Sequence, residues 1–188
     1  MSDYPLSEYP LSEYPPLTGI ALVLGGARSG KSQYAEGWAM SHGDGLYLAT
    51  AEPGDAEMAE RIRQHRERRG ARWTTKEEPI DIAVTIAWDA RPERVILVDC
   101  LTLWLSNLME ADQNIDHATL ALVQALESAR GPVILVSNEV GLGIVPDNEL
   151  ARLFLDCAGR LNQVVAGVAD QVVFMAAGLP MVLKGEGQ

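Results

Sequence analysis

The chain has 188 residues, 47% of them hydrophobic and 22% charged, so it is long enough to bury the core of one globular domain. Its formal net charge of −11 at pH 7 argues against a general affinity for nucleic acid or anionic membrane surfaces. The two cysteines, Cys100 and Cys157, are far apart, so we expect free thiols rather than a structural zinc site. Neither a signal peptide nor a membrane span is evident, which predicts a cytoplasmic protein.

Residues 2–16 repeat a five-residue unit in which serine, an acidic residue, tyrosine and proline follow one another. A proline in every unit forbids a regular helix and disfavours a central strand. We therefore expect residues 1–17 to form an extended tail and residues 18–188 to form a single domain. A dispensable tail is the favoured interpretation, and docking of its tyrosines on a neighbour is the alternative.

A short apolar run at residues 20–24 leads directly into the pattern G-x-x-x-x-G-K-S, and residues 33–40 then have helical character. A strand, a glycine loop and a helix in this order are the context of a phosphate-binding P-loop. Backbone N–H groups and the helix N-terminus would hold phosphate oxygens, the lysine would reach the β- and γ-phosphates, and the serine hydroxyl would bind Mg²⁺. The predicted nucleotide-binding residues here are Gly25, Gly26, Ala27, Arg28, Ser29, Gly30, Lys31 and Ser32.

Buried strand patterns alternate with helical patterns along the rest of the chain. This alternation predicts an α/β fold of the P-loop NTPase-like kind, with three layers and a mostly parallel sheet. A final hairpin would add one antiparallel edge strand. Strands are expected at residues 46–50, 73–75, 95–98, 133–137, 171–176 and 180–184, and helices at residues 55–69, 80–88, 101–109, 116–129 and 147–168.

Two acidic residues follow predicted strands and are candidates for the site. Asp99 ends the strand at residues 95–98, where a P-loop protein keeps the carboxylate that holds Mg²⁺ directly or through water. The alternative for Asp99 is a cap of the following helix. Glu139 follows the strand at residues 133–137, and the residues do not decide whether it orients a nucleophile or braces the adjacent glycine loop.

His65 shares the inward face of the predicted helix at residues 55–69 with Met58 and Ile62. Seven of the fifteen lysines and arginines lie between Arg61 and Lys76, and nearby cations keep an imidazole neutral. A neutral imidazole is a nucleophile for phosphorus. The alternative is a structural histidine on a helix whose charges form solvent-exposed ion pairs. His42 and His117 have no metal-ligand spacing around them, so they are expected at the surface.

Several segments together resemble one family, the bifunctional adenosylcobinamide kinase/adenosylcobinamide-phosphate guanylyltransferases of cobalamin biosynthesis. The resemblance covers residues 19–184, and the asparagine–glutamate–valine–glycine segment with the helix-borne histidine is its specific part. The repeat at residues 2–16 is not part of the family pattern. The matching segments are residues 25–32, 47–50, 57–62, His65, residues 73–77, 99–102, 137–146 and 158–163.

The resemblance implies two reactions on a corrinoid. ATP or GTP first phosphorylates adenosylcobinamide; the histidine that aligns with His65 then attacks the α-phosphate of GTP, and GMP passes to the cobinamide phosphate. The resemblance also implies a homo-oligomer, with a trimer as the expectation. The P-loop motif and the strand-end carboxylate, and not the resemblance, predict Mg²⁺ at Ser32 and Asp99. Beyond the P-loop, the implied nucleotide-binding residues are Thr50, Ala51, Glu52, Arg66, Glu67, Arg68, Arg69, Glu77 and Asp99.

Two other functions fit the motifs without the resemblance. A simple P-loop kinase of small molecules would transfer a phosphoryl group without a covalent GMP intermediate, and His65 would then be structural. A nucleotide-dependent switch or scaffold would turn over slowly and would use the tail to dock a partner.

Overall fold

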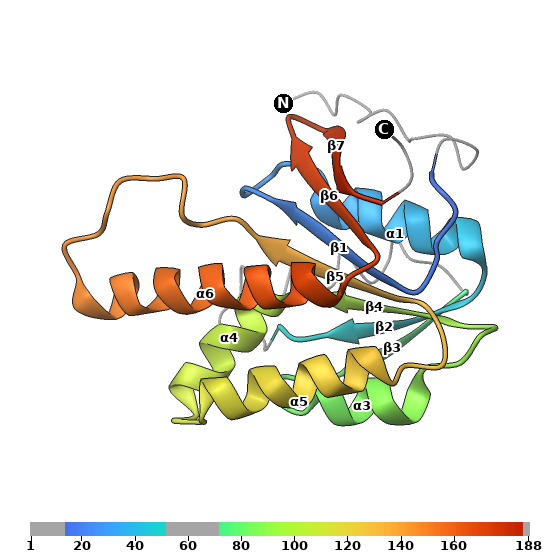
Figure 1. Cartoon of the computed structure of the whole chain (residues 1–188), viewed down its shortest axis with the longest axis horizontal. Coiled ribbons are helices and arrows are strands. Elements are labelled where there is room, and N and C mark those ends of the chain that lie inside the picture. Colours follow the sequence, from blue (N-terminus) through green and yellow to red (C-terminus); the bar gives the residue numbers. More distant parts are fainter. Residues whose placement is uncertain (1–13, 52–71, 186–188) are drawn as a thin grey trace.

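A computed structural model describes residues 14–51 and 72–185, which contain a single seven-stranded sheet (Figure 1). The strand order is β3-β2-β4-β5-β1-β6-β7, and every neighbouring pair is parallel except β6 with β7. The predicted α/β fold, with its antiparallel edge strand, is therefore confirmed. The strands are β1 (Ile20–Gly25), β2 (Gly45–Ala49), β3 (Trp73–Glu77), β4 (Val95–Asp99), β5 (Val133–Asn138), β6 (Gln171–Ala176) and β7 (Leu179–Lys184).

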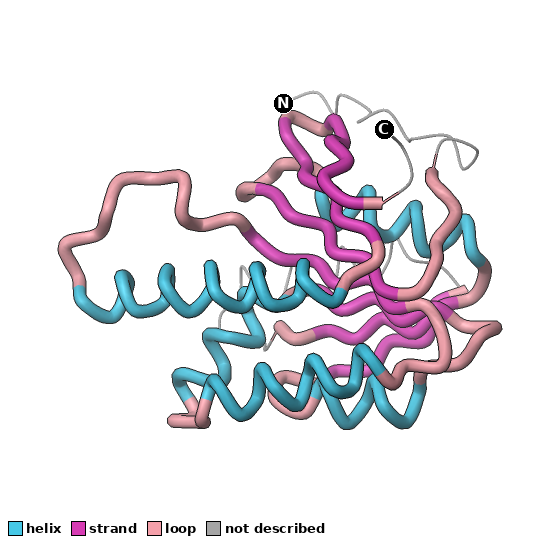
Figure 2. The backbone as a smooth tube through the Cα atoms, viewed as in Figure 1, coloured by secondary structure: helices cyan, strands magenta, loops and turns pink. Residues whose placement is uncertain are grey.

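Helices cover both faces of this sheet, as parallel strands require, because each crossover must return the chain to the same edge (Figure 2). On one face α1 (Lys31–His42) buries Trp38 against the side chains of Ala21 and Val23. On the other face Ile20 and Leu22 belong to a larger core. The helices packed there are α3 (Ile82–Asp89), α4 (Leu101–Glu110), α5 (Ile115–Glu127) and α6 (Glu149–Val168).

Local hydrogen bonds explain why two helices begin two residues later than expected. Before α3, the Glu78 carboxylate accepts the N–H groups of Ile80 and Asp81 at 3.2 and 2.8 Å, which forms a turn. Before α6, Asn148 acts as the N-cap and its side-chain oxygen accepts the Ala151 N–H at 3.1 Å. The helix expected at residues 55–69 lies outside the described residues.

The last residues of the repetitive segment pack on α1. The Tyr14 ring lies 5.1 Å from the Tyr34 ring, and the Trp38 indole N–H donates to the Pro15 carbonyl at 2.7 Å. A Cβ at Gly37 would overlap the Tyr14 phenol, so this glycine within α1 makes room for the ring. Residues 1–13 lie outside the described residues, and the division of the chain at residue 17 stays a prediction.

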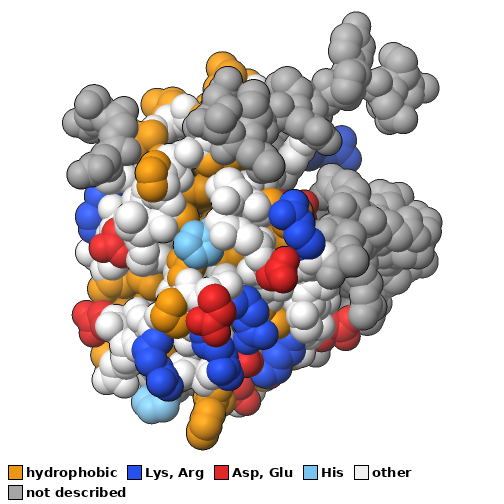
Figure 3. Space-filling view, turned by 90° about the vertical axis from the view of Figure 1, so that its right-hand side faces the viewer, with side chains coloured by type: hydrophobic (Ala, Val, Ile, Leu, Met, Phe, Trp, Pro, Cys, Tyr) orange, Lys and Arg blue, Asp and Glu red, His pale blue; other side chains and the backbone are white. Residues whose placement is uncertain are grey.

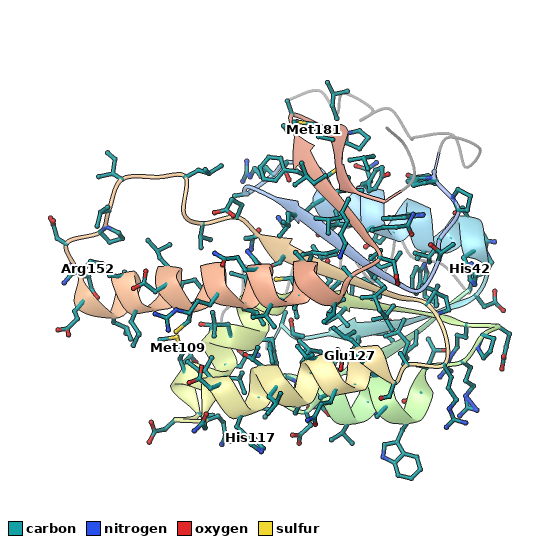
Figure 4. The ribbon with its side chains drawn as sticks, viewed as in Figure 1. His42, Met109, His117, Glu127, Arg152 and Met181 are labelled. Atoms are coloured by element: carbon teal, nitrogen blue, oxygen red, sulfur yellow. The ribbon has the colours of Figure 1, made fainter. Side chains whose placement is uncertain are left out.

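The surface carries charges of both signs. Figure 3 shows a face where lysine and arginine side chains lie among aspartates and glutamates. Asp89 is an example of this mixing, because its carboxylate lies 3.1 Å from Arg94 and 3.7 Å from Lys76. His42 and His117 are exposed, as expected (Figure 4). Within residues 14–51 and 72–185, no helix has the length and apolarity needed to cross a bilayer.

Candidate nucleotide-binding site

The turn between β1 and α1 is built by two glycines that lie against the β6–β7 hairpin. A Cβ on Gly25 would come within 2.5 Å of Ser29 Oγ and 2.7 Å of the Met175 carbonyl oxygen, so no side chain fits there. Gly30 caps α1 with a positive φ of 93°, a conformation that favours glycine. The Gly178 N–H donates to the Ser29 carbonyl at 3.0 Å and fastens the loop to the hairpin.

Hydrogen bonds within the P-loop hold it against the start of α1. The Ser29 N–H and the Lys31 ammonium both donate to the Gly26 carbonyl, at 3.3 and 3.2 Å. The Ser29 hydroxyl is buried and has no hydrogen-bond partner in the described part of the chain. A buried polar atom without a partner is costly, so a ligand that supplies one fits here. With the N-terminus of α1, these groups form a cradle suited to phosphate oxygens.

Asp99 lies at the end of β4, on the same carboxyl edge of the sheet as the P-loop. Its Oδ2 accepts a hydrogen bond from the Tyr47 hydroxyl at 2.7 Å. The N-cap of α4 is Cys100, without a side-chain cap, so the alternative role of Asp99 as the helix cap is not supported. Ligands of open α/β sheets bind at this carboxyl edge.

The oxygen ligands at this edge suit Mg²⁺. The predicted ligands are the Ser32 hydroxyl at the start of α1 and the Asp99 carboxylate. Among residues 14–51 and 72–185 there is no cluster of three or more His, Cys, Asp or Glu that could hold a metal by itself. Mg²⁺ characteristically combines one or two protein oxygens with phosphate oxygens and water, so a nucleotide would complete the set.

Thr50 links the end of β2 to the end of β4 by hydrogen bonds. Its side chain is fully buried, and its hydroxyl accepts the Cys100 N–H at 2.7 Å and donates to the Cys100 carbonyl at 2.8 Å. The Asn107 amide donates to the Thr50 carbonyl at 2.8 Å. Burial raises the pKa of the Cys100 thiol to about 11, with the Asp99 charge as the second cause, so the thiol stays protonated. Thr50 thus supports the backbone on which Asp99 is presented.

The remaining predicted nucleotide-binding residues divide between the described edge and the region outside it. Ala51 follows Thr50 and is half-buried, while Glu77 ends β3 and is exposed. Glu77 pairs with Ala49 of β2, which in turn pairs with Asp99, so all three lie at the same sheet edge. The predicted residues outside the described part of the chain are Glu52, His65, Arg66, Glu67, Arg68 and Arg69.

A second polar cluster joins α4, β5 and α6 next to the P-loop. The Thr102 hydroxyl accepts the Asn138 N–H at 2.7 Å, and the Asn162 amide donates to the Asn138 carbonyl at 3.3 Å. The Glu139 N–H donates to the Gly25 carbonyl at 3.1 Å, and the Glu139 carboxylate accepts the Gly141 N–H at 2.6 Å. These bonds agree with the bracing alternative for Glu139. Thr102 and Asn162 belong to matching segments, but sequence reasoning gave them no role.

The sheet, its glycine turn after β1 and the acidic residue at the end of β4, one strand removed from β1, define the P-loop nucleotide-binding class of protein. The same fold occurs in a solved ATPase of a bacterial type III secretion system, with a TM-score of 0.52 and 12% identity. The match covers 88% of this chain and 57% of that one. At this identity the likeness shows the fold alone.

Sequence comparison identifies the family within this class. Residues 21–183 match the model of the cobinamide kinase/cobinamide phosphate guanyltransferase family, and the chain belongs to that family. It is 52% identical to the bifunctional adenosylcobalamin biosynthesis protein CobP of Pseudomonas aeruginosa over 168 residues, which cover 88% of this chain and 97% of CobP. It is 39% identical to CobU of Salmonella typhimurium over 178 residues, which cover 87% and 98% of the two chains. The family resemblance is thereby confirmed.

Proposed function

We propose that this protein is a bifunctional enzyme of adenosylcobalamin biosynthesis. It phosphorylates adenosylcobinamide with ATP or GTP and then transfers GMP from GTP to the cobinamide phosphate, giving adenosylcobinamide-GDP. Family membership over residues 21–183 supports the two activities. The single structural observation that carries the kinase half is the closed P-loop with its unpartnered Ser29 hydroxyl beside α1.

In the kinase reaction, the substrate hydroxyl attacks the γ-phosphorus and the bond to the β–γ bridging oxygen breaks. Lys31 and the loop N–H groups bind the phosphate oxygens on which negative charge is spread. Ser32 and Asp99 are the residues that would hold Mg²⁺, which supplies additional charge neutralisation when bound. The fixed loop therefore acts by orienting the triphosphate and by offsetting its charge.

In the guanylyl transfer, His65 is the proposed nucleophile. A neutral imidazole nitrogen attacks the α-phosphorus of GTP, pyrophosphate leaves, and a phosphoramidate to GMP forms. A phosphate oxygen of the cobinamide phosphate then attacks the same phosphorus and releases the histidine. Arg66, Arg68 and Arg69 are proposed to balance the charge of the bound triphosphate. This half rests on the family match and on the sequence around His65.

Labelling with GTP that carries radioactive phosphorus at the α position tests the covalent step. We expect acid-labile, base-stable label on the wild-type chain and none on His65→Ala. His117→Ala is the matched control, because His117 is exposed on α5, and it should label like the wild type. Equal label on His65→Ala would move the nucleophile elsewhere. No label on any chain, with corrinoid phosphorylation intact, would leave a simple kinase.

We further propose that the protein is a homo-oligomer, with a trimer as the expected state. The loop between β5 and α6 exposes Leu142, Ile144 and Val145 to 81, 97 and 72%, and it projects beyond the sheet with the first turns of α6 (Figures 1 and 4). Contiguous exposed apolar side chains mark interaction surfaces. The Arg152 guanidinium holds the end of this loop by donating to the Pro146 and Asp147 carbonyls at 2.9 and 2.7 Å.

A further inference from the structure

Two aromatic residues of the matching segments, Tyr47 and Trp73, have no function in the proposal so far. Tyr47 lies in β2, is 4% exposed, and belongs to the core on the α1 side of the sheet. β2 and β4 are parallel, with Tyr47 beside Leu97 and Ala49 beside Asp99. Side chains two residues apart on a strand share a face, so Asp99 lies on the same face as Leu97, the partner of Tyr47. Tyr47 and Asp99 are therefore diagonal neighbours on adjacent strands, and the Tyr47 hydroxyl donates to Asp99 Oδ2 at 2.7 Å.

The Tyr47 ring is itself held by Trp73 of the neighbouring strand. The two rings meet edge to face, with centroids 5.9 Å apart and an interplanar angle of 84°. Trp73 pairs with Gly45 in the parallel register of β2 and β3. A Cβ on Gly45 would overlap the Trp73 indole, so the glycine leaves the space that the indole fills. Gly45, Trp73 and Tyr47 thus form a packed series that ends at the Asp99 carboxylate.

The hydrogen bond selects one orientation of this carboxylate. A carboxylate has two oxygens, and donation to Oδ2 from a buried, packed ring limits rotation about the Cβ–Cγ bond. The Tyr47 hydroxyl therefore leaves Oδ1 in a defined position at the carboxyl edge of the sheet. A side chain that binds a metal ion does so well only when its own hydrogen-bond partners hold it in the right orientation.

We propose that Tyr47 is a positioning residue, which orients the Asp99 carboxylate toward the Mg²⁺–nucleotide complex, and that Trp73 and Gly45 fix the tyrosine ring. This inference rests on the proposed nucleotide site and not on the transfer of GMP or on the corrinoid. In this proposal Tyr47 does not contact the nucleotide or the substrate, and it acts through Asp99.

The test is the Mg²⁺ dependence of nucleotide binding in Tyr47→Phe, which removes the hydroxyl and keeps the ring. Binding of a fluorescent GTP analogue is titrated with Mg²⁺ and is measured separately in EDTA. We expect the Mg²⁺ concentration for half-maximal binding to rise about tenfold to a hundredfold, as for the loss of one hydrogen bond to a charged group, with affinity in EDTA unchanged. Trp73→Leu, which keeps the hydroxyl but frees the ring, should give a smaller shift in the same direction.

Tyr34→Phe is the matched control, because Tyr34 is also buried on the α1 side and the Tyr47–Asp99 bond does not involve it. Its Mg²⁺ midpoint should equal that of the wild type. An unchanged midpoint in Tyr47→Phe, with only the free energy of unfolding lowered, would overturn the proposal and leave the hydroxyl a structural role. A wild-type chain that binds nucleotide with Mg²⁺ but modifies no corrinoid would refute the proposed function without touching this inference.

Discussion

Two loops leave the sheet side by side and differ in what holds them. β1 and β5 are parallel neighbours with Gly25 beside Asn138, so the P-loop and the β5–α6 loop start at the same place. Each contains glycines. The P-loop is fastened to the β6–β7 hairpin and to its own backbone. The β5–α6 loop is bonded at its two ends, while Leu142 and Ile144 between them are exposed.

One glycine from each loop differs in the space around it. Gly25 of the P-loop has no room for a side chain, because Ser29 and the Met175 carbonyl occupy that space. At Gly143 of the β5–α6 loop a Cβ would meet nothing within 4 Å. The first loop is held in one shape, as we propose for a preformed cradle for phosphate oxygens. The second presents apolar side chains for which the described residues supply no covering surface, which supports a second subunit as its partner.

The largest effect is expected from removing the cation of the cradle. In Lys31→Ala we expect kcat for corrinoid phosphorylation to fall about 100- to 1000-fold, because one preorganised charge on the transferred phosphoryl group is lost. The fold should survive, since the Lys31 ammonium donates to a loop carbonyl at the surface of the cradle. Steady-state kinetics and thermal denaturation measure the two quantities. Lys76→Ala, an exposed lysine of β3, is the control, and an equal loss there would contradict the role of Lys31.

The sheet and the P-loop could be predicted from sequence because their signals are local. Continuous apolar runs such as residues 95–98 and 133–136 predict strands buried on both faces, and they are almost fully buried. The glycine pattern likewise requires a particular backbone: Gly25 has the close contacts, and Gly30 the positive φ, that such a turn needs.

The supporting contacts of the site could not be predicted, because each joins residues far apart in the chain. The bond from Tyr47 to Asp99 spans 52 positions, and the one between Thr102 and Asn138 spans 36. Nothing in the spacing of a tyrosine and an aspartate reveals that two strands will place them diagonally. The strand order decides this, because it sets β2 beside β4. The segment that carries His65 lies outside the described residues, so its predicted role stays a prediction.

An intermediate effect is expected at the base of the β5–α6 loop. Thr102→Val keeps the size of the side chain but leaves the Asn138 N–H without the acceptor that it has at 2.7 Å. Thr102 is buried, so we expect the free energy of unfolding to fall by about 1–3 kcal/mol. Thr102→Ser, which keeps the hydroxyl, should recover most of the loss in urea denaturation. An equal loss in both variants would show that the methyl group, and not the hydrogen bond, carries the stability.

The smallest effect on folding, and a clear one on assembly, is expected at the exposed part of the same loop. Ile144 is 97% exposed, so Ile144→Ser should change the free energy of unfolding by less than about 0.5 kcal/mol when measured on the dilute monomer. If the loop is a subunit contact, the mass measured by light scattering should fall toward that of one chain. Leu179→Ser on β7 removes another exposed apolar side chain, 64% exposed, and should leave the mass unchanged. Loss of assembly in the β7 variant alone would place the subunit contact on the β6–β7 hairpin. The β5–α6 loop would then have no partner subunit, and the two loops would differ only in that the P-loop is held in place by its hydrogen bonds.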